Sequence, residues 1–248
     1  MTQLPALSVQ TYTVRDDLGP RAGETLARLR ALGFANVEPF NIVSDPEGLA
    51  RDLEAVGLRA RTAHANIVML DREEVVAAAR RLGVEAVIVP WAEPDRFRSH
   101  ESIRELAGEI NDAARFAAHH GVAVGYHNHE FEFATHVRGT PTWEILVDEL
   151  DDDVVIELDT YWASVGGADV FELIPRRSTR VRYLHVNDEP PEDGDPPTLG
   201  EPIAGRMSEV VAVAAPHADL IVVEIVVDGD VFPRLERNAR FFQRMLAS

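Results

Sequence analysis

The sequence predicts an α/β fold, a (β/α)8 TIM barrel in which residues 1–248 form a single domain. The length of 248 residues is close to the roughly 250 typical of such a barrel. Short apolar runs alternate with helix-like segments from one end of the chain to the other, which favours a parallel sheet wrapped by helices. A helix closed by a glycine and followed by a strand recurs at Gly33, Gly57, Gly83 and Gly121.

Eight strands and eight helices are expected from this alternation. The strands are Ala6–Thr11, Phe34–Phe40, Leu58–Asn66, Glu85–Pro90, Val122–Asn128, Asp153–Asp159, Arg180–Asn187 and Asp219–Ile225. The helices are Arg21–Leu32, Pro46–Val56, Arg72–Leu82, Ser99–His120, Thr142–Leu150, Ala168–Pro175, Met207–Ala215 and Val231–Leu246. Pro141 suits the first position of the fifth helix. An open doubly wound sheet is the alternative, although neither a glycine-rich dinucleotide fingerprint nor a Walker loop is present.

Composition narrows the classes of partner. The formal net charge of −18 argues against a nucleic acid, which needs a basic surface, and against anionic membranes. The absence of cysteine excludes disulfides, thiolate zinc sites and cysteine nucleophiles. No basic region followed by an apolar stretch opens the sequence, so we expect no signal peptide, and no apolar run approaches the roughly 18 residues of a membrane span. We expect a cytoplasmic protein that binds a small molecule; a homo-oligomer through the last helix stays open.

Three ionisable side chains stand where consecutive predicted strands end. They are Asp159 in VVIELDTYW, His185 in RVRYLHVND and Glu224 in LIVVEIVVD. The carboxyl ends of parallel barrel strands meet at one mouth, so we expect these groups at matching depths, where they suit a divalent metal. Alone, Asp159 could be a helix cap and His185 a core histidine. Glu224 lies between apolar neighbours, and its carboxylate would be costly to bury without a partner.

The fifth predicted strand ends in YHNHEFE, which adds two histidines. Alternation places His127 and His129 on one face of the strand, where they suit a metal ligand or a proton carrier. Other side chains at strand ends could line a ligand pocket or pack at its rim: Gln10, Tyr12, Glu38, His64, Asn66, Trp91, Tyr161 and Trp162. Glu38 could also be a structural carboxylate paired with an arginine. The acidic segment Asp188–Gly205 follows the seventh strand and is expected over the mouth, as a lid or as a solvated loop.

The chain resembles the xylose-isomerase-like barrels, and more specifically the sugar phosphate isomerase/epimerase group with its inosose dehydratase and tagatose 3-epimerase relatives. The motifs that carry the resemblance occur in the family's order: SVQTYTVRDDL, VEPF, GYHNHEFEF, LDTYWASVGGADV, RYLHVND and IVVEIVVD. The resemblance implies a divalent ion, Mn²⁺ foremost and Mg²⁺, Co²⁺ or Zn²⁺ otherwise. Asp159, His185 and Glu224 match the family's ligands.

Three positions depart from the family's pattern. His127 stands where the epimerases have a glutamate that binds metal and moves a proton. Trp162 replaces a substrate-binding histidine, and Asn187 replaces the lysine of a His-Val-Lys-Asp motif. By the resemblance, Trp162 and Asn187 are substrate-binding positions with an altered partner. The related DNA-repair endonucleases use extra histidines for a larger zinc cluster, and here the charge and Trp162 argue against that activity.

The resemblance and the site residues together predict a metal-dependent sugar isomerase or epimerase. Glu224 or a histidine, His127 or His129, would remove the α-proton of a keto sugar or cyclitol and give a metal-stabilised enediolate. Return of the proton gives epimerisation or isomerisation, whereas loss of a β-hydroxyl makes the enzyme a dehydratase (a lyase). A non-catalytic sugar-binding barrel is the competing class, and a purely structural barrel would leave the histidines without a purpose.

Overall fold

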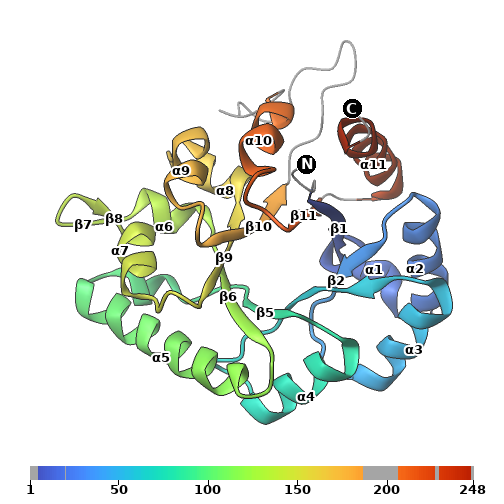
Figure 1. The fold of residues 1–248 in the computed structure, drawn as a ribbon, viewed down its shortest axis with the longest axis horizontal. Helices are drawn as coiled ribbons and strands as arrows, with labels where there is room; N and C mark the ends of the chain where they lie inside the picture. Colours follow the sequence, from blue (N-terminus) through green and yellow to red (C-terminus); the bar gives the residue numbers. More distant parts are fainter. Residues whose placement is uncertain (1–4, 20, 187–205, 227–228, 247–248) are drawn as a thin grey trace.

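The computed structural model describes residues 5–19, 21–186, 206–226 and 229–246. Its parallel strands form a ring at the centre of the molecule and its helices surround that ring (Figure 1). The strands of the main sheet are β1 Ala6–Gln10, β2 Asn36–Glu38, β3 Arg59–Ala60, β4 Thr62–His64, β5 Ala86–Val89, β6 Ala123–His127, β9 Val155–Asp159, β10 Val181–Val186 and β11 Leu220–Val223. The sequence-based prediction of a TIM barrel is confirmed.

The ring closes through a third barrel strand that is split in two. The described sheet runs β3-β2-β1-β11-β10-β9-β6-β5-β4, so β3 and β4 stand at its two ends. Only Arg61 separates them: β3 pairs with β2, and β4 pairs with β5. A parallel bridge between Phe40 and His64, with His64 N–H donating to Pro39 O at 2.9 Å, joins β2 to β4. The expected continuous strand Leu58–Asn66 is therefore wrong in one detail, but the open-sheet alternative is excluded.

The helices of the described chain alternate with these strands. They are α1 Arg15–Leu18, α2 Ala22–Ala31, α3 Pro46–Val56, α4 Arg72–Leu82, α5 His100–Ala118, α6 Glu130–Ala134, α7 Thr142–Glu149, α8 Thr160–Val165, α9 Val170–Arg176, α10 Met207–Ala214 and α11 Phe232–Leu246. The bounds of α3 and α4 match the sequence prediction because strong signals mark both ends. Asp45 and Asp71 cap the first turns, and Gly57 and Gly83 adopt positive φ of 71° and 72° at the last.

Several short elements were not predicted. Helices α1, α6 and α8 have four to six residues, too short for a periodic apolar pattern. Two 3-10 turns, Thr11–Val14 and Pro94–Phe97, and a hairpin of β7 His136–Val137 with β8 Thr140–Pro141 were also missed. That hairpin makes Pro141 the N-cap of α7 and not its first helical residue. The expected lid Asp188–Gly205 lies outside the described residues.

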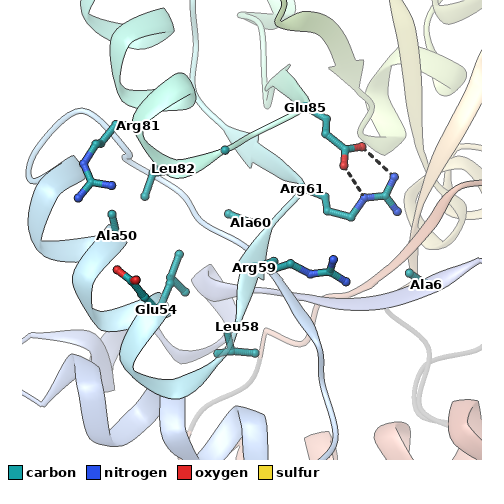
Figure 2. A pocket seen from close by; sticks show the side chains of 12 residues that line it. Ala6, Ala50, Glu54, Leu58, Arg59, Ala60, Arg61, Arg81, Leu82 and Glu85 are labelled. Carbon is teal, nitrogen blue, oxygen red and sulfur yellow. Dashed lines mark hydrogen bonds and ion pairs between the residues drawn. The ribbon is translucent and has the colours of Figure 1, made fainter.

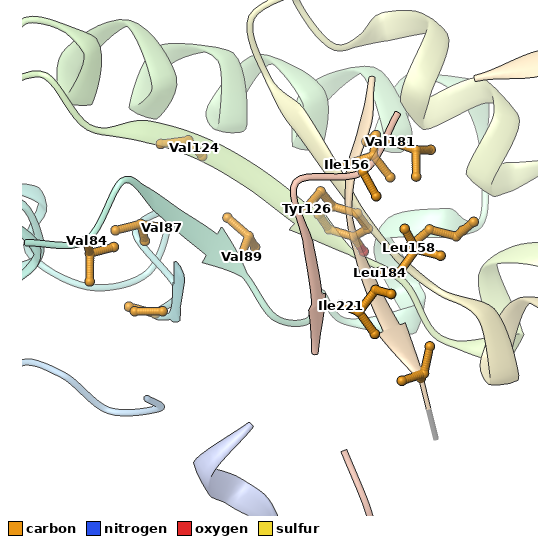
Figure 3. Packing of buried hydrophobic residues seen from close by; sticks show 14 of the residues in the cluster. Val84, Val87, Val89, Val124, Tyr126, Ile156, Leu158, Val181, Leu184 and Ile221 are labelled. Atoms are coloured by element: carbon orange, nitrogen blue, oxygen red, sulfur yellow. The ribbon is translucent and has the colours of Figure 1, made fainter. Parts of the chain in front are cut away.

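Two apolar layers hold the barrel together. Outward-facing strand residues pack under the helices, and Figure 3 shows part of this layer around Val87, Val124, Tyr126 and Ile156. A smaller cluster fills the lower half of the barrel interior: Ala86, Ile88, Tyr183, Leu220 and Val222. Above it the inward-facing positions become polar. The barrel is thus sealed at the amino ends of its strands and carries its ionisable groups at the carboxyl ends, where TIM barrels place their sites.

The amino end of the barrel carries a structural ion pair. A hollow of about 690 Å³ lies beside the starts of β3 and β5, and Figure 2 shows Arg61 and Glu85 joined at its edge. Arg61 donates Nε to Oε1 at 3.0 Å and Nη2 to Oε2 at 2.8 Å of Glu85, and Nη1 to Asp219 O at 3.2 Å. This guanidinium links three strand starts across the barrel floor, a position associated with stability in this fold. In the described part of the chain, no helix has the length and apolarity to cross a bilayer.

Candidate metal centre

The carboxyl ends of the barrel strands bring four predicted ligands together. They are His127 at the end of β6, Asp159 at the end of β9, His185 in β10 and Glu224 just after β11. We refer to these four residues as the upper quartet. Each offers one ligand atom, and the four atoms lie within 4.8 Å of one another. His127 Nε2 is 3.9 Å from Asp159 Oδ2, and His185 Nδ1 is 3.3 Å from Glu224 Oε2.

The strand register explains how the quartet converges. Asp159 is the register partner of His185, so their side chains start at one level. The partner of His185 in β11 is Val222, and Glu224 stands two residues further on. The expected matching depth therefore holds for Asp159 and His185, whereas the longer side chain of Glu224 reaches the site from one level above.

The two carboxylate oxygens of Asp159 have different tasks. Oδ1 accepts the Trp162 N–H at 2.8 Å and caps helix α8, so the expected capping role is real. Oδ2 is buried and has no hydrogen-bond partner among the described residues. A buried oxygen with an unfilled lone pair beside two histidines and a second carboxylate fits a cation. Asn128 fixes this geometry, because its amide pairs with the backbone of Asp159 at 3.0 and 3.1 Å.

A second group of charged side chains lies below the quartet. It contains Glu38 at the end of β2, His64 at the end of β4 and Glu157 in β9, and we call these three residues the lower trio. His64 Nε2 lies 2.7 Å from Glu157 Oε2 and 3.0 Å from Glu38 Oε1. The carboxylates of the trio also meet the quartet's rings: His185 Nε2 is 2.7 Å from Glu38 Oε1, and His127 Nδ1 is 3.1 Å from Glu157 Oε2.

Burial and mutual charge shift the ionisation of these groups. Burial raises the pKa of Asp159 to about 7, and burial with repulsion from Glu38 raises the pKa of Glu157 to about 7. For Glu38, burial is outweighed by the two neighbouring histidines, which hold its pKa well below the usual range. For His64, burial is outweighed by Glu38 and Glu157, which raise its pKa to about 10. The charges of the lower trio thus compensate one another, whereas burial disfavours the charged form of Asp159, which a bound cation would stabilise.

The mouth above the quartet is lined by a histidine and aromatic rings. His129 follows His127 and approaches its ring to 5.2 Å between centroids, and Trp162 lies 6.3 Å from His129. His129 Nδ1 is buried without a described partner, and burial lowers the ring's pKa, so a neutral imidazole faces the site. Trp91 and Tyr12 are partly exposed at the rim, with Tyr12 edge-on against Phe40 at 5.4 Å.

The remaining predicted residues occupy less accessible positions. Gln10 is fully buried: its amide donates to Glu38 Oε1 at 2.8 Å and accepts from Tyr12 N at 3.0 Å. Glu38 is paired with Gln10 and two histidines rather than with an arginine. Asn66 donates to Trp91 O at 3.0 Å. Asn187 lies outside the described residues, and its expected role stays a prediction.

Sequence reasoning missed Glu157. Attention to strand ends selects Asp159, whereas Glu157 lies two residues earlier inside the apolar run VVIELD. The signal was available, because a period of two places both carboxylates on one face of the strand. An acidic residue on the inward face of an otherwise apolar strand needs buried partners.

The donor set defines the ions that the quartet suits. Two imidazoles and two carboxylates are borderline-to-hard ligands, as used for Zn²⁺, Mn²⁺ and similar divalent ions. Such an ion polarises a carbonyl oxygen and stabilises negative charge that develops on it.

Comparison with known proteins agrees with this architecture. The family model described as xylose isomerase-like TIM barrel matches residues 26–210. A search of curated protein sequences found no match.

Solved structures share the fold at low sequence identity. A sugar phosphate isomerase/epimerase from Parabacteroides distasonis superimposes with a TM-score of 0.80 at 19% identity, covering 98% of this chain and 94% of its own. An L-ribulose 3-epimerase gives 0.70 at 15% identity, with 98% and 95% covered. The probable 3-DHS dehydratase AsbF from Bacillus anthracis gives 0.70 at 13% identity, with 96% and 98% covered. By its family model and its fold, the chain belongs to the xylose isomerase-like TIM barrel family.

Proposed function

We propose that this protein is a divalent-metal-dependent isomerase or epimerase that moves the α-proton of a keto sugar or cyclitol. The observation that carries the proposal is the buried Asp159 Oδ2 inside the upper quartet, which has no hydrogen-bond partner in the described part of the chain. The ion, Mn²⁺ in the first instance, would polarise the substrate carbonyl and stabilise the negative charge formed when the α-proton leaves.

The chain's own residues supply the proton carriers. Burial alone would raise the pKa of Glu224, but the hydrogen bond and charge of His185 bring it below its ordinary value. Glu224 is therefore a carboxylate at neutral pH, able to accept a proton as general base. His129 is neutral, and its Nδ1 has no hydrogen-bond partner among the described residues, so we assign it the uptake of a proton from solvent and the delivery of that proton to carbon, while Glu224 releases the abstracted proton to solvent. His127 serves as a ligand through Nε2, because its Nδ1 already meets Glu157.

The walls of the mouth suit a neutral polyol. Trp162 and Trp91 offer flat apolar faces, and the ring of His129 offers a hydrogen-bonding nitrogen near them, whereas Arg15 covers one face of Tyr12. Sugar rings combine apolar C–H faces with hydroxyl edges, so aromatic walls with few polar groups are a common way to bind them. Asn66, which presents a buried amide oxygen without a described partner, adds an acceptor near the rim.

Dehydration is the second candidate outcome of the same chemistry. The fold neighbour named as a probable 3-DHS dehydratase shows that one relative of this architecture is assigned a lyase reaction. Removal of the α-proton by Glu224 is common to both outcomes. They differ in whether the proton returns or a β-hydroxyl leaves, which depends on whether His129 protonates carbon or the departing oxygen.

Solvent exchange tests the proposal whichever product is formed. The Mn²⁺-loaded protein is incubated in heavy water with a panel of free ketoses and inosose, and NMR follows the α-C–H signals. We expect deuterium incorporation at one α-carbon of one panel member, loss of exchange after chelation, and recovery with Mn²⁺. Full activity in excess chelator, with no metal by elemental analysis, would contradict the proposal. Binding without exchange would identify a non-catalytic sugar-binding barrel.

A further inference from the structure

The rings of His127 and His185, the two proposed ligand histidines, each face two different groups of partners. One nitrogen of each ring points to the upper quartet: His127 Nε2 is 3.9 Å from Asp159 Oδ2, and His185 Nδ1 is 3.3 Å from Glu224 Oε2. The other nitrogen points down to the lower trio. His127 Nδ1 is 3.1 Å from Glu157 Oε2, and His185 Nε2 is 2.7 Å from Glu38 Oε1.

This arrangement creates a competition between two cation positions. His64, His127, Glu157 and His185 form a second set of four groups whose ligand atoms lie within 4.8 Å, and it shares both rings with the upper quartet. A neutral imidazole has one lone pair and one N–H. It can therefore bind an ion through one nitrogen only while the other donates a hydrogen bond. If one ion bound in the upper quartet and a second ion bound in the lower set, the rings of His127 and His185 would each have to lose both N–H protons.

The hydrogen bonds of the lower trio decide the competition. Glu38 Oε1 lies within hydrogen-bond distance of Gln10 Nε2, His64 Nε2 and His185 Nε2. Glu157 Oε2 has the same relation to His64 Nε2 and His127 Nδ1. These two oxygens are already supplied with donors, whereas Glu38 Oε2, Glu157 Oε1 and Asp159 Oδ2 have no hydrogen-bond partner among the described residues. The ring nitrogens that meet Glu38 Oε1 and Glu157 Oε2 are engaged below, which leaves His127 Nε2 and His185 Nδ1 for an ion in the upper quartet.

We propose that Glu38, His64 and Glu157 are positioning residues that fix the tautomers and ring planes of His127 and His185, so that one ion binds in the upper quartet. This inference rests on the proposed metal-dependent function and adds to it the residues that orient the ligands. Carboxylates that accept the second N–H of a metal-bound histidine typically contribute about 10- to 100-fold in metal affinity.

Each member of the trio is itself held in place. Gln10 is clamped between Glu38 and the Tyr12 N–H, so the Glu38 carboxylate has a fixed donor on its far side. Glu157 is the register partner of His127, which sets the spacing between its carboxylate and that ring through backbone pairing. His64 stands between the two carboxylates and lies parallel to the His185 ring, with 5.1 Å between centroids and 10° between planes. The lower trio is fully buried, apart from the edge of the His64 ring.

Glu157→Gln tests the role of the trio most directly. A side-chain amide keeps the volume and one acceptor oxygen, but it removes the negative charge that strengthens the hydrogen bonds of Glu157 Oε2 with His64 and His127. We expect wild-type protein to bind one Mn²⁺ or Zn²⁺ per chain, and E157Q to bind with about 10- to 100-fold lower affinity. The measurement is competition against a chromophoric chelator.

Two further readouts separate positioning from general destabilisation. In the Zn²⁺-loaded wild type, ¹⁵N NMR should show His127 protonated at Nδ1 and His185 at Nε2, and in E157Q the Nδ1–H of His127 should exchange faster with solvent because its acceptor is uncharged. Glu132→Gln is the matched control: Glu132 is equally buried, accepts from Tyr126 O–H at 2.7 Å and His129 N–H at 3.2 Å, and contacts neither ring. E132Q should keep wild-type affinity and N–H exchange. If E157Q does not fold, Glu38→Gln is measured instead, with faster solvent exchange of the His185 Nε2–H as its signature.

The outcomes are distinct. Wild-type affinity and N–H exchange in E157Q or E38Q, or an equal loss in E132Q, would overturn the positioning role while leaving the proposed function intact. Two ions per wild-type chain would also overturn it, because the lower group would then bind metal itself. No bound ion in the wild type would overturn the proposed function together with this inference.

Discussion

At the scale of single residues, Asp159 joins the fold to the site. One of its oxygens caps helix α8, and the other lies unpartnered among the quartet's ligand atoms. The sequence offered these as alternatives, a helix cap or a metal ligand, and the structure combines the cap with a position suited to a ligand. A carboxylate has enough acceptor capacity for both. The capping bond also fixes the side-chain rotamer and so directs the second oxygen into the barrel mouth.

Substitution of the proposed base tests the chemistry at this scale. Glu224→Gln keeps size and hydrogen bonding but removes the basic oxygen, so we expect the rate on the identified substrate to fall by about 10²- to 10⁴-fold. Thermal unfolding of the metal-free protein should change little, and the rates are compared at saturating Mn²⁺ because Glu224 also belongs to the quartet. Glu85→Gln, at the opposite end of the barrel, is the control and should keep its rate. An unchanged rate in E224Q would remove Glu224 from the mechanism.

The affinity for the ion should depend on pH. Burial raises the pKa of Asp159 to about 7, so below that pH the carboxyl is mostly protonated and an ion must displace the proton. His185, whose pKa the glutamates raise despite its burial, must also release a proton to act as a ligand. Both effects have the same sign: affinity for Mn²⁺ should fall as the pH drops from about 7.5 to about 5.5, by about tenfold per unit for each displaced proton. Chelator competition across this range measures it, and a flat profile would contradict these ionisation states.

The limits of sequence reading are visible at single residues. Asp159, His185, Glu224 and His127 could be predicted because each interrupts or ends an apolar run. Glu157 was missed because it lies within such a run, and the partners of Glu38 could not be identified because they come from strands far away in sequence. The alternation of residues along a strand predicts the face of the sheet on which a side chain lies. It does not predict which rings from other strands contact that side chain.

At the scale of elements, the two short helices α6 and α8 support the mouth. Helix α6 follows His129 and α8 follows Asp159, and the two helices pack against each other. Their closest approach is at Gly166, where an added Cβ would lie 2.4 Å from Glu130 O and 2.6 Å from Phe133 Cβ. The glycine is required here by space, because its φ of −72° is open to any residue.

Gly166→Ala should therefore force the two helices apart. Overpacking against backbone costs about 1–3 kcal/mol, which corresponds to a decrease of about 2–10 °C in unfolding temperature for a chain of this size. Because the helices lead from Asp159 and His129, metal affinity should fall as well. Gly108→Ala in α5 is the control: it has nothing within 4 Å and should leave stability equal or slightly higher. Equal melting curves for wild type and G166A would contradict the close packing.

The predictability of the elements follows their length and their caps. For helices with a capping aspartate and a terminal glycine, the first and last residues could be predicted correctly from the sequence. The split of the third strand at Arg61 could not be foreseen, because it arises from the need to pair with β2 at one end and β5 at the other. The short helices and the β7–β8 hairpin lack a periodic signal of their own. Their positions depend on tertiary contacts.

At the scale of the whole molecule, the two ends of the barrel differ in the arginine and carboxylate side chains that they carry. The 248 residues contain no lysine, so all 24 basic side chains are arginines. Arg61 and Arg182 are committed to ion pairs at the amino end of the barrel, with Glu85 and Asp219. The carboxyl end carries the carboxylates of the quartet and the trio. These carboxylates favour attraction of a small cation to the mouth.

A bound ion should stabilise the whole barrel, since the unfolded chain cannot assemble the quartet. At a free Mn²⁺ concentration about 100 times the dissociation constant, linkage adds about 2.7 kcal/mol. For a chain of this size we expect a rise of about 5–10 °C in unfolding temperature, measured by scanning fluorimetry. The shift should be absent with chelator and small in His185→Gln. An identical melting temperature with and without Mn²⁺ would contradict the linkage.

The central claim is that the upper quartet binds one divalent ion, and equilibrium dialysis against Mn²⁺ followed by elemental analysis tests it most directly. Asp159→Asn is the informative variant, because asparagine caps a helix as well as aspartate does but cannot supply an anionic ligand. We predict one ion per wild-type chain and less than about a tenth of that occupancy in D159N under the same conditions. No ion in the wild type, or full occupancy in D159N, would contradict the account.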